Sequence, residues 1–276
     1  MEKISDKFDL SKKVAVITGG AGLLGVKHAQ TIASQGGIPL LWDINFELAQ
    51  SRAQQIVHEY DCVCEAFSVD IINIDNVESC FSKIINKYES VDILINNAAN
   101  DPKPSADNSL AWARLENFTS EMWHKDLDVG VLGAFNCSKT IGVSMANTRG
   151  GVILNIASDL GVIAPDQRIY RIPGLPESQQ PVKPVTYSVV KHAIIGLTKY
   201  LATYWANDNV RVNALSPGGV FTNQPDEFVQ KLSSLIPLGR MANEDEYQAA
   251  VLFLVSEASS YMTGSNMVVD GGRTCW

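Results

Sequence analysis

The chain has 276 residues, of which 46% are hydrophobic, and it carries a formal net charge of −8 at pH 7. This length allows one large domain with a sizeable core, and the negative charge argues against a nucleic-acid-binding surface. No apolar run reaches the length of a membrane span, and the N-terminus, MEKISDKFDL, lacks the apolar core of a signal peptide. We therefore expect one cytoplasmic domain over residues 1–276 that contacts neither nucleic acid nor membrane.

Short apolar runs alternate with helical patterns along the whole chain. Strands are predicted at residues 13–18, 38–43, 63–70, 91–97, 151–158, 210–217 and 266–272. Helices are predicted at residues 23–34, 46–59, 75–88, 120–146, 186–206 and 244–256. This alternation predicts an α/β fold: a doubly wound, mainly seven-stranded parallel sheet with helices on both faces.

A cluster of glycines follows the first predicted strand, in VITGGAGLLG at residues 16–25. A glycine-rich turn between a strand and a helix is a phosphate-binding arrangement, because its N–H groups and the helix dipole favour negative charge. Glycine also lets the backbone approach a pyrophosphate closely. The turn therefore predicts the phosphate site of a bound dinucleotide.

The second predicted strand ends in Asp43, roughly 20 residues after the glycines, where an acidic residue binds the adenosine ribose 2′-hydroxyl. Asp43 would repel a 2′-phosphate, and no Arg or Lys follows it immediately, so the sequence favours NAD(H) over NADP(H). The same aspartate is also a candidate N-cap for the helix predicted from residue 46.

Two long segments, 100–116 and 159–185, interrupt the alternation of strands and helices. Loops of this length inside a compact domain are uncommon and are often functional. The first segment contains Lys103 and Arg114, and the second contains Lys183. Together the two segments could cover a large polar pocket. Surface packing or a subunit contact is the alternative.

The stretch YSVVK places Tyr187 and Lys191 at i and i+4, on one face of a predicted helix. A free tyrosine has a pKa near ~10, and a lysine ammonium one turn away stabilises the phenolate and lowers that pKa. Ser158 ends a predicted strand at the carboxyl edge of the sheet, where its hydroxyl can hydrogen-bond a substrate carbonyl or alcohol. A Tyr–Lys pair at this spacing also occurs on ordinary helices.

With these motifs in order, the chain resembles the short-chain dehydrogenase/reductase family, in its compact single-domain branch, from residue 14 to residue 272. The motifs are TGGAGLLG, NNAA, NIASDLG, YSVVK, PGGVFT and VDGG. The resemblance implies Tyr187 as acid/base, Ser158 as substrate polariser, and Lys191 as the group that lowers the tyrosine pKa and binds the nicotinamide ribose. It implies NAD as cofactor and a homotetramer or homodimer. The cofactor-binding residues expected from the turn and the resemblance are Gly19, Gly22, Leu23, Leu24, Gly25, Asp43, Ile44, Asp70, Ile71, Asn97, Tyr187, Lys191, Val220 and Thr222.

The sequence departs from the family pattern at three places. Leu23 stands where the compact branch usually has glycine, and the Ser158–Tyr187 separation is more than twice the usual length. Gly130 stands where the family places an asparagine that relays protons through water from the lysine. We expect a local helix deformation at Gly130, or space there for substrate or the 159–185 segment, with Asp126 one turn earlier as a water ligand.

The sequence therefore predicts an NAD-dependent oxidoreductase that transfers hydride between nicotinamide and an alcohol or carbonyl substrate. The glycine turn and the long Ser158–Tyr187 segment also resemble oxidoreductases of bacterial flagellin-glycan pathways, which implies a sugar or sugar-nucleotide substrate. A non-catalytic NAD-binding sensor or scaffold, and an epimerase or lyase that recycles hydride, are the alternatives.

The cysteines and histidines predict no metal site. Cys62 and Cys64 share a predicted strand but lack further ligands at suitable spacing, so we interpret all five cysteines as buried thiols. His192 should point away from the Tyr187–Lys191 face.

Overall fold

The computed structural model describes residues 3–100 and 111–276. Its sheet has seven strands in the order β3-β2-β1-β4-β5-β6-β7, and every neighbouring pair is parallel. The strands are β1 (Val14–Thr18), β2 (Ile38–Asp43), β3 (Glu65–Ser68), β4 (Ile93–Asn96), β5 (Gly151–Ile156), β6 (Val210–Pro217) and β7 (Asn266–Val269). The predicted doubly wound parallel sheet is confirmed, and its strand order reverses between β1 and β4.

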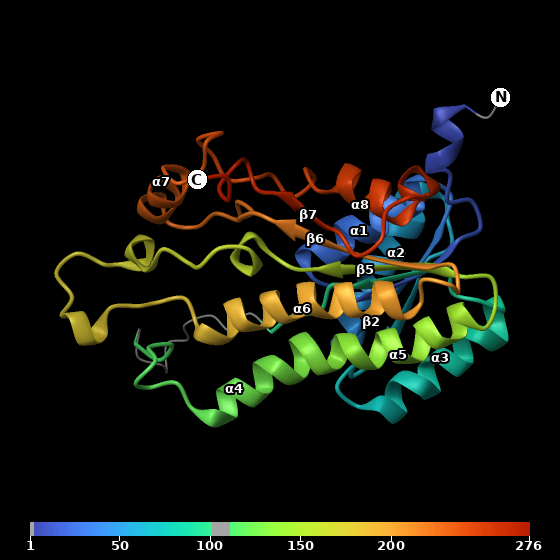
Figure 1. Ribbon diagram of the computed structural model, residues 1–276, viewed down its shortest axis with the longest axis horizontal. Coiled ribbons are helices and arrows are strands. Elements are labelled where there is room, and N and C mark those ends of the chain that lie inside the picture. Colours follow the sequence, from blue (N-terminus) through green and yellow to red (C-terminus); the bar gives the residue numbers. More distant parts are fainter. Residues whose placement is uncertain (1–2, 101–110) are drawn as a thin grey trace.

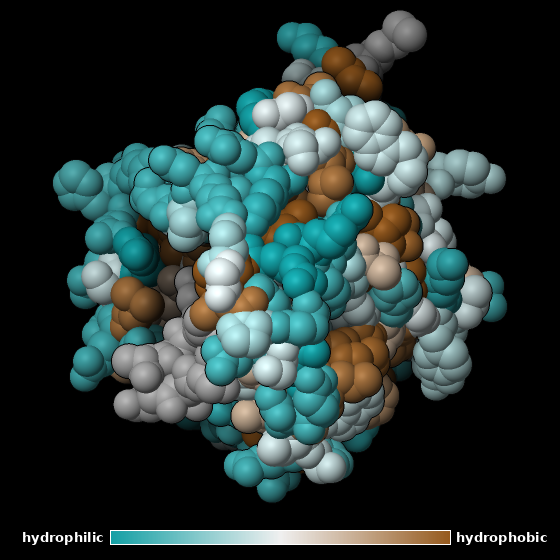
Figure 2. Space-filling model, turned by 90° about the vertical axis from the view of Figure 1, so that its left-hand side faces the viewer, coloured by the Kyte–Doolittle hydropathy of each residue, from teal (hydrophilic) through white to brown (hydrophobic). Residues whose placement is uncertain are grey.

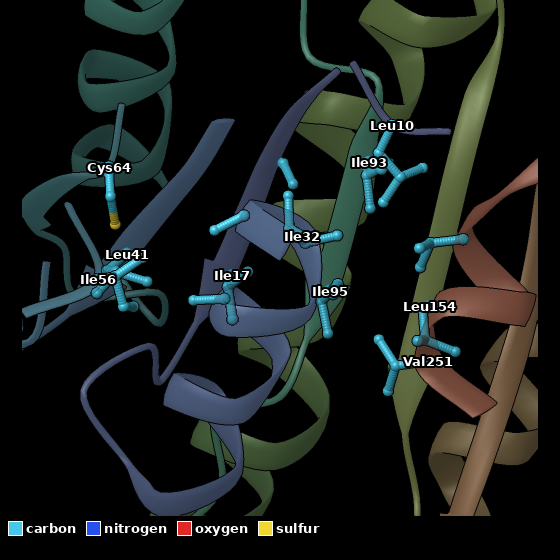
Figure 3. Packing of buried hydrophobic residues seen from close by; sticks show 14 of the residues in the cluster. Leu10, Ile17, Ile32, Leu41, Ile56, Cys64, Ile93, Ile95, Leu154 and Val251 are labelled. Atoms are coloured by element: carbon cyan, nitrogen blue, oxygen red, sulfur yellow. The ribbon is translucent and has the colours of Figure 1, made fainter. Parts of the chain in front are cut away.

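Helices cover both faces of this sheet (Figure 1). They are α1 (Leu23–Ser34), α2 (Phe46–Tyr60), α3 (Ile74–Tyr88), α4 (Ser120–Leu127), α5 (Ala134–Ala146), α6 (Val185–Tyr204), α7 (Asp226–Ser233) and α8 (Gln248–Val255). On one face, Ile32 of α1, Ile56 of α2 and Val251 of α8 pack on strand residues such as Ile95 (Figure 3). A second core joins α3, α5 and α6 to the opposite face.

The carboxyl ends of the strands lie toward the left-hand end of the molecule in Figure 1. Residues 159–185, α7 and the C-terminal segment gather at this end. Figure 2 looks onto it and shows many hydrophilic side chains with several hydrophobic patches among them. In an open parallel sheet, ligands bind at this edge, so the fold itself directs attention there.

Three local predictions need correction. The sequence pattern missed α7, whose eight residues, DEFVQKLS, carry only a short apolar face. The last helix begins at Gln248 rather than near residue 244. β3 begins at Glu65, so Cys62 and Cys64 lie in the connection after α2 instead of in a strand.

The helix predicted over 120–146 changes geometry around Gly130. Between α4 and α5, residues Asp128–Gly133 form a π-helix, so the predicted deformation is confirmed. A Cβ placed on Gly130 would overlap Cγ1 of Val190 on α6. Val190, and not the 159–185 segment, occupies the space that glycine leaves, and the two helical elements approach closely as a result.

We predict that the stability effect of Gly130→Ala changes sign with residue 190. In the wild type the new methyl group collides with Val190, and overpacking of this kind destabilises by about 1–3 kcal/mol. In a Val190→Ala background the collision is relieved, and the alanine should stabilise by up to about 1 kcal/mol through its higher helix propensity. Urea unfolding of the four variants measures both values. Equal destabilisation in the two backgrounds would contradict this packing.

Candidate active site

A groove opens at the carboxyl edge of the sheet where β1 and β4 diverge. Its volume is about 1020 Å³, a size typical of ligand clefts. Among the residues that line it, nine belong to the cofactor-binding set expected from the sequence: Gly19, Gly22, Leu23, Leu24, Asp43, Ile44, Asp70, Ile71 and Asn97. Helix α4 contributes Glu121, His124 and Lys125, and the π-helical stretch that follows it contributes Asp128; sequence reasoning missed all four. These side chains come from a helix far along the chain, and only tertiary packing places them here.

The glycine turn has the geometry that a pyrophosphate requires. Gly19 has φ +61°, and a Cβ there would lie 2.9 Å from the Ala98 backbone. A Cβ on Gly25 would overlap the carbonyl oxygen of Gly19, so α1 packs directly on the turn. The N-cap of α1 is Gly22, which supplies no side-chain hydrogen bond. The N–H groups of the first helical turn therefore keep their capacity to bind an anion.

Asp43 joins the end of β2 to the glycine turn. Its Oδ2 accepts a hydrogen bond from the Ala21 N–H at 3.1 Å, and its Oδ1 accepts one from the Asn45 N–H at 2.9 Å. Asn45, not Asp43, is the N-cap of α2, because its side chain accepts from the Leu48 N–H. The alternative role of Asp43 as a helix cap is therefore wrong, and its carboxylate faces the groove.

Asn97, directly after β4, also holds the glycine turn. Its side-chain amide donates to the carbonyls of Thr18 and Gly19 at 3.0 and 3.1 Å. Val220 and Thr222 follow β6 and are not among the described residues that line the groove. Val220 forms a bridge with Ala242, and the Thr222 N–H donates to Gln224. Expected cofactor-binding residues from the first hundred positions thus line the groove, whereas Val220 and Thr222 are not among its described lining residues.

Two lysines approach the ring of Tyr187. Lys191 is only 6% exposed, its Nζ donates to the carbonyl of Ile156 at 2.9 Å, and this Nζ lies 5.8 Å from the ring centroid. Lys183, from the 159–185 segment, places its Nζ 3.7 Å from the same centroid. A positive charge near a tyrosine ring favours the phenolate form of such a residue. The contribution of Lys183 could not be read from the YSVVK motif.

Ser158 lies just beyond β5 on a framework of buried polar groups. Its Oγ donates to Asp159 Oδ1 at 2.7 Å and accepts from the Leu160 N–H at 3.2 Å. The other carboxylate oxygen of Asp159 pairs with Arg273 at 2.7 Å, and the two residues are 3% and 6% exposed. Arg273 is 114 positions away in the sequence, so no local pattern could reveal this pair. The ion pair holds the hydroxyl of Ser158 in one orientation.

The same segment brings Ser158 toward α6. The 3₁₀ turn Asp159–Gly161 packs against α6, and a Cβ on Gly161 would lie 2.8 Å from the Lys191 carbonyl. The Lys191 ammonium in turn donates a hydrogen bond to the carbonyl of Ile156, which lies two residues before Ser158. Ser158 and Lys191 are thus both held at the carboxyl end of β5, and Tyr187 lies one helical turn before Lys191.

The 159–185 segment is a packed structure and not an open loop. Gln180 anchors it from within by hydrogen bonds to both backbone polar groups of Ile172 and to the Leu175 carbonyl. Ile169 packs on α7, and Tyr170 lies 5.6 Å from Phe228, centroid to centroid. This segment and α7 form a small separate core at the edge of the sheet.

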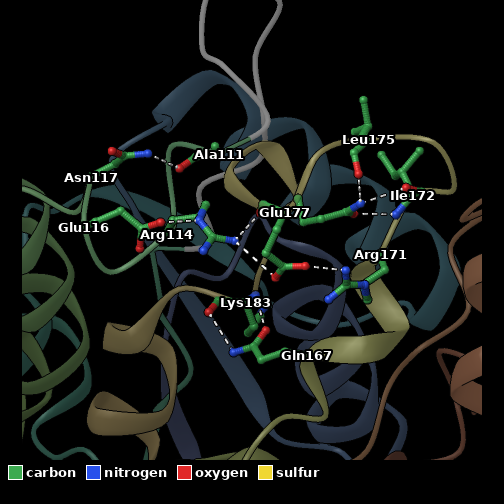
Figure 4. Close-up of polar contacts among 11 residues, drawn as sticks. Ala111, Arg114, Glu116, Asn117, Gln167, Arg171, Ile172, Leu175, Glu177 and Lys183 are labelled. Atoms are coloured by element: carbon green, nitrogen blue, oxygen red, sulfur yellow. Dashed lines mark hydrogen bonds and ion pairs between the residues drawn. The ribbon is translucent and has the colours of Figure 1, made fainter.

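An arginine connects this segment to the other long one (Figure 4). The Arg114 guanidinium donates to the Glu177 carbonyl at 2.8 Å, and Glu177 also pairs with Arg171. The two segments thus meet over the carboxyl edge, as a pocket cover requires. Residues 101–110, including Lys103, lie outside the described residues.

The remaining candidates for chemistry are accounted for in the described part of the chain. Cys64, Cys80 and Cys137 are buried, and burial raises the pKa of the Cys64 thiol to about 12. Cys62 is half-buried and Cys275 is exposed, so the interpretation of all five as buried thiols is wrong.

His192 is exposed, and its ring contacts the Ser188 carbonyl, away from Lys191 as expected. Among the described residues there is no group of three or more His, Cys, Asp or Glu suited to a metal ion. The described helices also include none long and apolar enough to span a membrane.

Known protein sequences match this chain along nearly its whole length. A family model described as short chain dehydrogenase matches residues 13–170, and one described as enoyl-(acyl carrier protein) reductase matches residues 177–274. The chain is 32% identical to an NAD-dependent glycerol dehydrogenase of Listeria innocua, over 97% of this chain and 96% of the relative. It is 29% identical to D-threitol dehydrogenase of Mycolicibacterium smegmatis, over 99% and 98%.

A solved structure also matches the fold of this chain over nearly its full length. The gluconate 5-dehydrogenase from Burkholderia cenocepacia, in complex with NADP and tartrate, matches with a TM-score of 0.84 at 26% identity and covers 98% of both chains.

We predict that Asp159 and Arg273 stabilise the protein only as a pair. Arg273→Met should lower the free energy of unfolding by about 3–5 kcal/mol, because it leaves a buried carboxylate without its counter-charge. Adding Asp159→Asn removes that charge and should recover part of the loss, although Asp159→Asn alone destabilises the wild type. Chemical denaturation of the single and double variants measures the coupling. Simple additivity of the two losses would show that the ion pair has no such role.

Proposed function

Because the chain belongs to the short-chain dehydrogenase/reductase family of nicotinamide-dependent oxidoreductases, we propose that it interconverts an alcohol and a carbonyl compound with NAD, on a sugar alcohol or sugar. The observation that carries this proposal is the Tyr187 ring with two lysine ammonium groups at 3.7 and 5.8 Å from its centroid, together with a serine at the end of β5 whose hydroxyl donates to the ion-paired Asp159. This arrangement suits proton transfer to or from a substrate oxygen.

Each residue has a separate task in this proposal. Tyr187 takes the hydroxyl proton of the alcohol, or returns it to the carbonyl oxygen in the reverse direction. For Ser158 to orient the same oxygen, its hydroxyl turns away from Asp159, to which it donates in the structure, and donates to the substrate oxygen instead. Lys191, tethered to the Ile156 carbonyl, places a positive charge beside the phenol. A bound nicotinamide supplies the hydride acceptor or donor.

The charge of the groove supports NAD over NADP. Four carboxylates, those of Asp43, Asp70, Glu121 and Asp128, and one lysine, Lys125, are among the described residues that line it. This excess of negative charge opposes the 2′-phosphate of NADP. Since the relatives include NADP-dependent members such as a mannitol dehydrogenase of Alternaria alternata, the preference needs a direct test.

Polar side chains over the carboxyl edge support a hydroxyl-rich substrate. Arg114, Arg171 and Glu177 form one network there, and Asp166 pairs with Arg168 nearby. The named substrates of the two relatives, glycerol and D-threitol, are small polyols. A sugar nucleotide is the larger alternative within the same class. The presence of Ser158, Tyr187 and Lys191 together speaks against a purely sensory role, which would not need a proton-transfer group.

The homotetramer remains a prediction. Its support is a set of exposed apolar and aromatic side chains on α5 and α6: Phe135, Val143, Val189, Tyr200 and Tyr204. Such side chains suit a helix-to-helix contact between copies of the chain.

Replacing Tyr187 by phenylalanine should reduce turnover at least roughly 100-fold, in the range that a lost general acid or base accounts for. NAD affinity should stay nearly unchanged, because only one oxygen is removed. NADH formation from glycerol, D-threitol and xylitol, together with an NAD titration, measures both. Tyr200→Phe is the matched control, since Tyr200 lies on the same helix and is 63% exposed. If Tyr187→Phe retained most of the wild-type rate, the acid/base assignment would be wrong.

Asp43→Asn should shift cofactor preference toward NADP. The amide preserves an oxygen that can accept from the Ala21 or Asn45 N–H but removes the negative charge facing the groove. We expect the ratio of kcat/KM for NADP to that for NAD to rise roughly tenfold, which corresponds to about 1.4 kcal/mol. Steady-state kinetics with both cofactors measure this ratio. A wild type that already prefers NADP would refute the role of Asp43.

A further inference from the structure

A buried carboxylate beside Tyr187 has no task in the function proposed above. Asp126, on α4, is only 7% exposed. Its Oδ1 accepts a hydrogen bond from the Asn100 amide at 2.6 Å, and its Oδ2 accepts one from the hydroxyl of Thr186. Thr186 directly precedes Tyr187 on α6. The two hydrogen bonds hold the carboxylate where α4 packs against the start of α6.

Asp126, Tyr187 and Lys191 line one small cavity. Its volume is about 20 Å³, and its wall also includes Asn100 and Gly130. A space of this size holds a single water molecule when two to four polar partners surround it. Most of the cavity wall is apolar, and Asp126, Tyr187, Lys191 and Asn100 are lining residues whose polar groups can serve as such partners.

The helix that contains Asp126 offers no other polar side chain to the cavity. The π-helical stretch that follows α4 contributes Gly130 to the described lining. Glycine has no side chain that could donate or accept a hydrogen bond. Lys125 and His124, next to Asp126 in the sequence, line the neighbouring groove instead. Asp126 is therefore the group of this helix that can exchange a proton with the cavity.

We propose that Asp126 relays protons between Tyr187 and solvent through a water molecule held in this cavity. The inference rests on the proposed function, because a relay is needed only if Tyr187 gains and loses a proton in every turnover. In the oxidation direction the substrate carbon gives up a hydride, and the substrate hydroxyl gives its proton to Tyr187. Tyr187 passes a proton to the water, the water passes one to Asp126, and Asp126 releases it past the partly exposed Asn100. Reduction uses the same path backwards.

The charges around the cavity are compatible with this path. Asp126 is the one carboxylate among the described lining residues, and Lys191 is the one lysine among them. Lys183 lies over the Tyr187 ring, and Asp159, on the 3₁₀ turn packed against α6, is neutralised by Arg273. In this proposal Asp126 exchanges its proton with the water and not with substrate, so it is a relay residue, and its effects should appear in proton-transfer measurements.

The first test is the rate of polyol oxidation by Asp126→Asn, which keeps the size and an acceptor oxygen but cannot carry the proton. We expect kcat to fall roughly 10- to 100-fold near neutral pH, within the range for assisted proton transfer. In Asp126→Ala, added formate should restore part of the rate. Glu78→Gln, which removes an exposed carboxylate on α3 outside the site, is the control and should match the wild type. A normal rate and pH profile in Asp126→Asn, or no formate rescue of Asp126→Ala, would overturn the proposal.

The second test needs no substrate. The phenolate absorbance of the wild type and Asp126→Asn is followed against pH, each with a Tyr187→Phe counterpart subtracted. Removing a negative charge from the shared cavity favours the phenolate, so Tyr187 should ionise at lower pH in Asp126→Asn. Unchanged ionisation would refute the link between the two groups. If the wild type oxidises no polyol but this shift is observed, the proposed function fails while the coupling of Asp126 to Tyr187 stands.

Discussion

The hydrogen bond from the buried Lys191 ammonium to the Ile156 carbonyl is the contact on which the site depends. An ammonium group taken out of water needs acceptors, and a carbonyl at the end of β5 provides one. Lys191 thereby fixes α6 against the sheet. Tyr187 lies one helical turn before this contact, and Ser158 lies two residues beyond Ile156. Ser158 and the Tyr187–Lys191 pair, which are distant in the sequence, are thus joined to one strand end through a single tether.

The sheet supplies the second constraint, because its strand order reverses between β1 and β4. The segments that follow these two strands diverge and leave a groove. Side chains of β2, α1 and α4 line this groove. Ala99, just beyond β4, lines both this groove and the small cavity beside Tyr187. The place expected to hold a cofactor and the place expected to move protons are therefore adjacent.

The 159–185 segment shows how a common sheet acquires particular chemistry. Its Ile169 packs with Leu232, Ile236 and Met241 in a small core of its own, apart from the two large cores on the sheet. That core gives the segment a fixed course and so allows Lys183 to stand 3.7 Å from the Tyr187 ring centroid. Residues added between Ser158 and Tyr187 thus contribute to the electrostatics of the site as well as to its cover.

Local patterns in the sequence determined the parallel sheet, the glycine turn and the Tyr187–Lys191 pair. Each depends on neighbours within a few residues: strand and helix periodicity, backbone freedom at glycine, and one turn of helix. The sequence also indicated a disturbance at Gly130, since glycine is unfavourable inside a helix. Only tertiary structure decided what fills the space there, because Val190 comes from another helix. The Asp159–Arg273 pair, the cavity beside Asp126 and the position of Lys183 likewise join segments far apart in the chain, and such contacts arise from packing that no local pattern encodes.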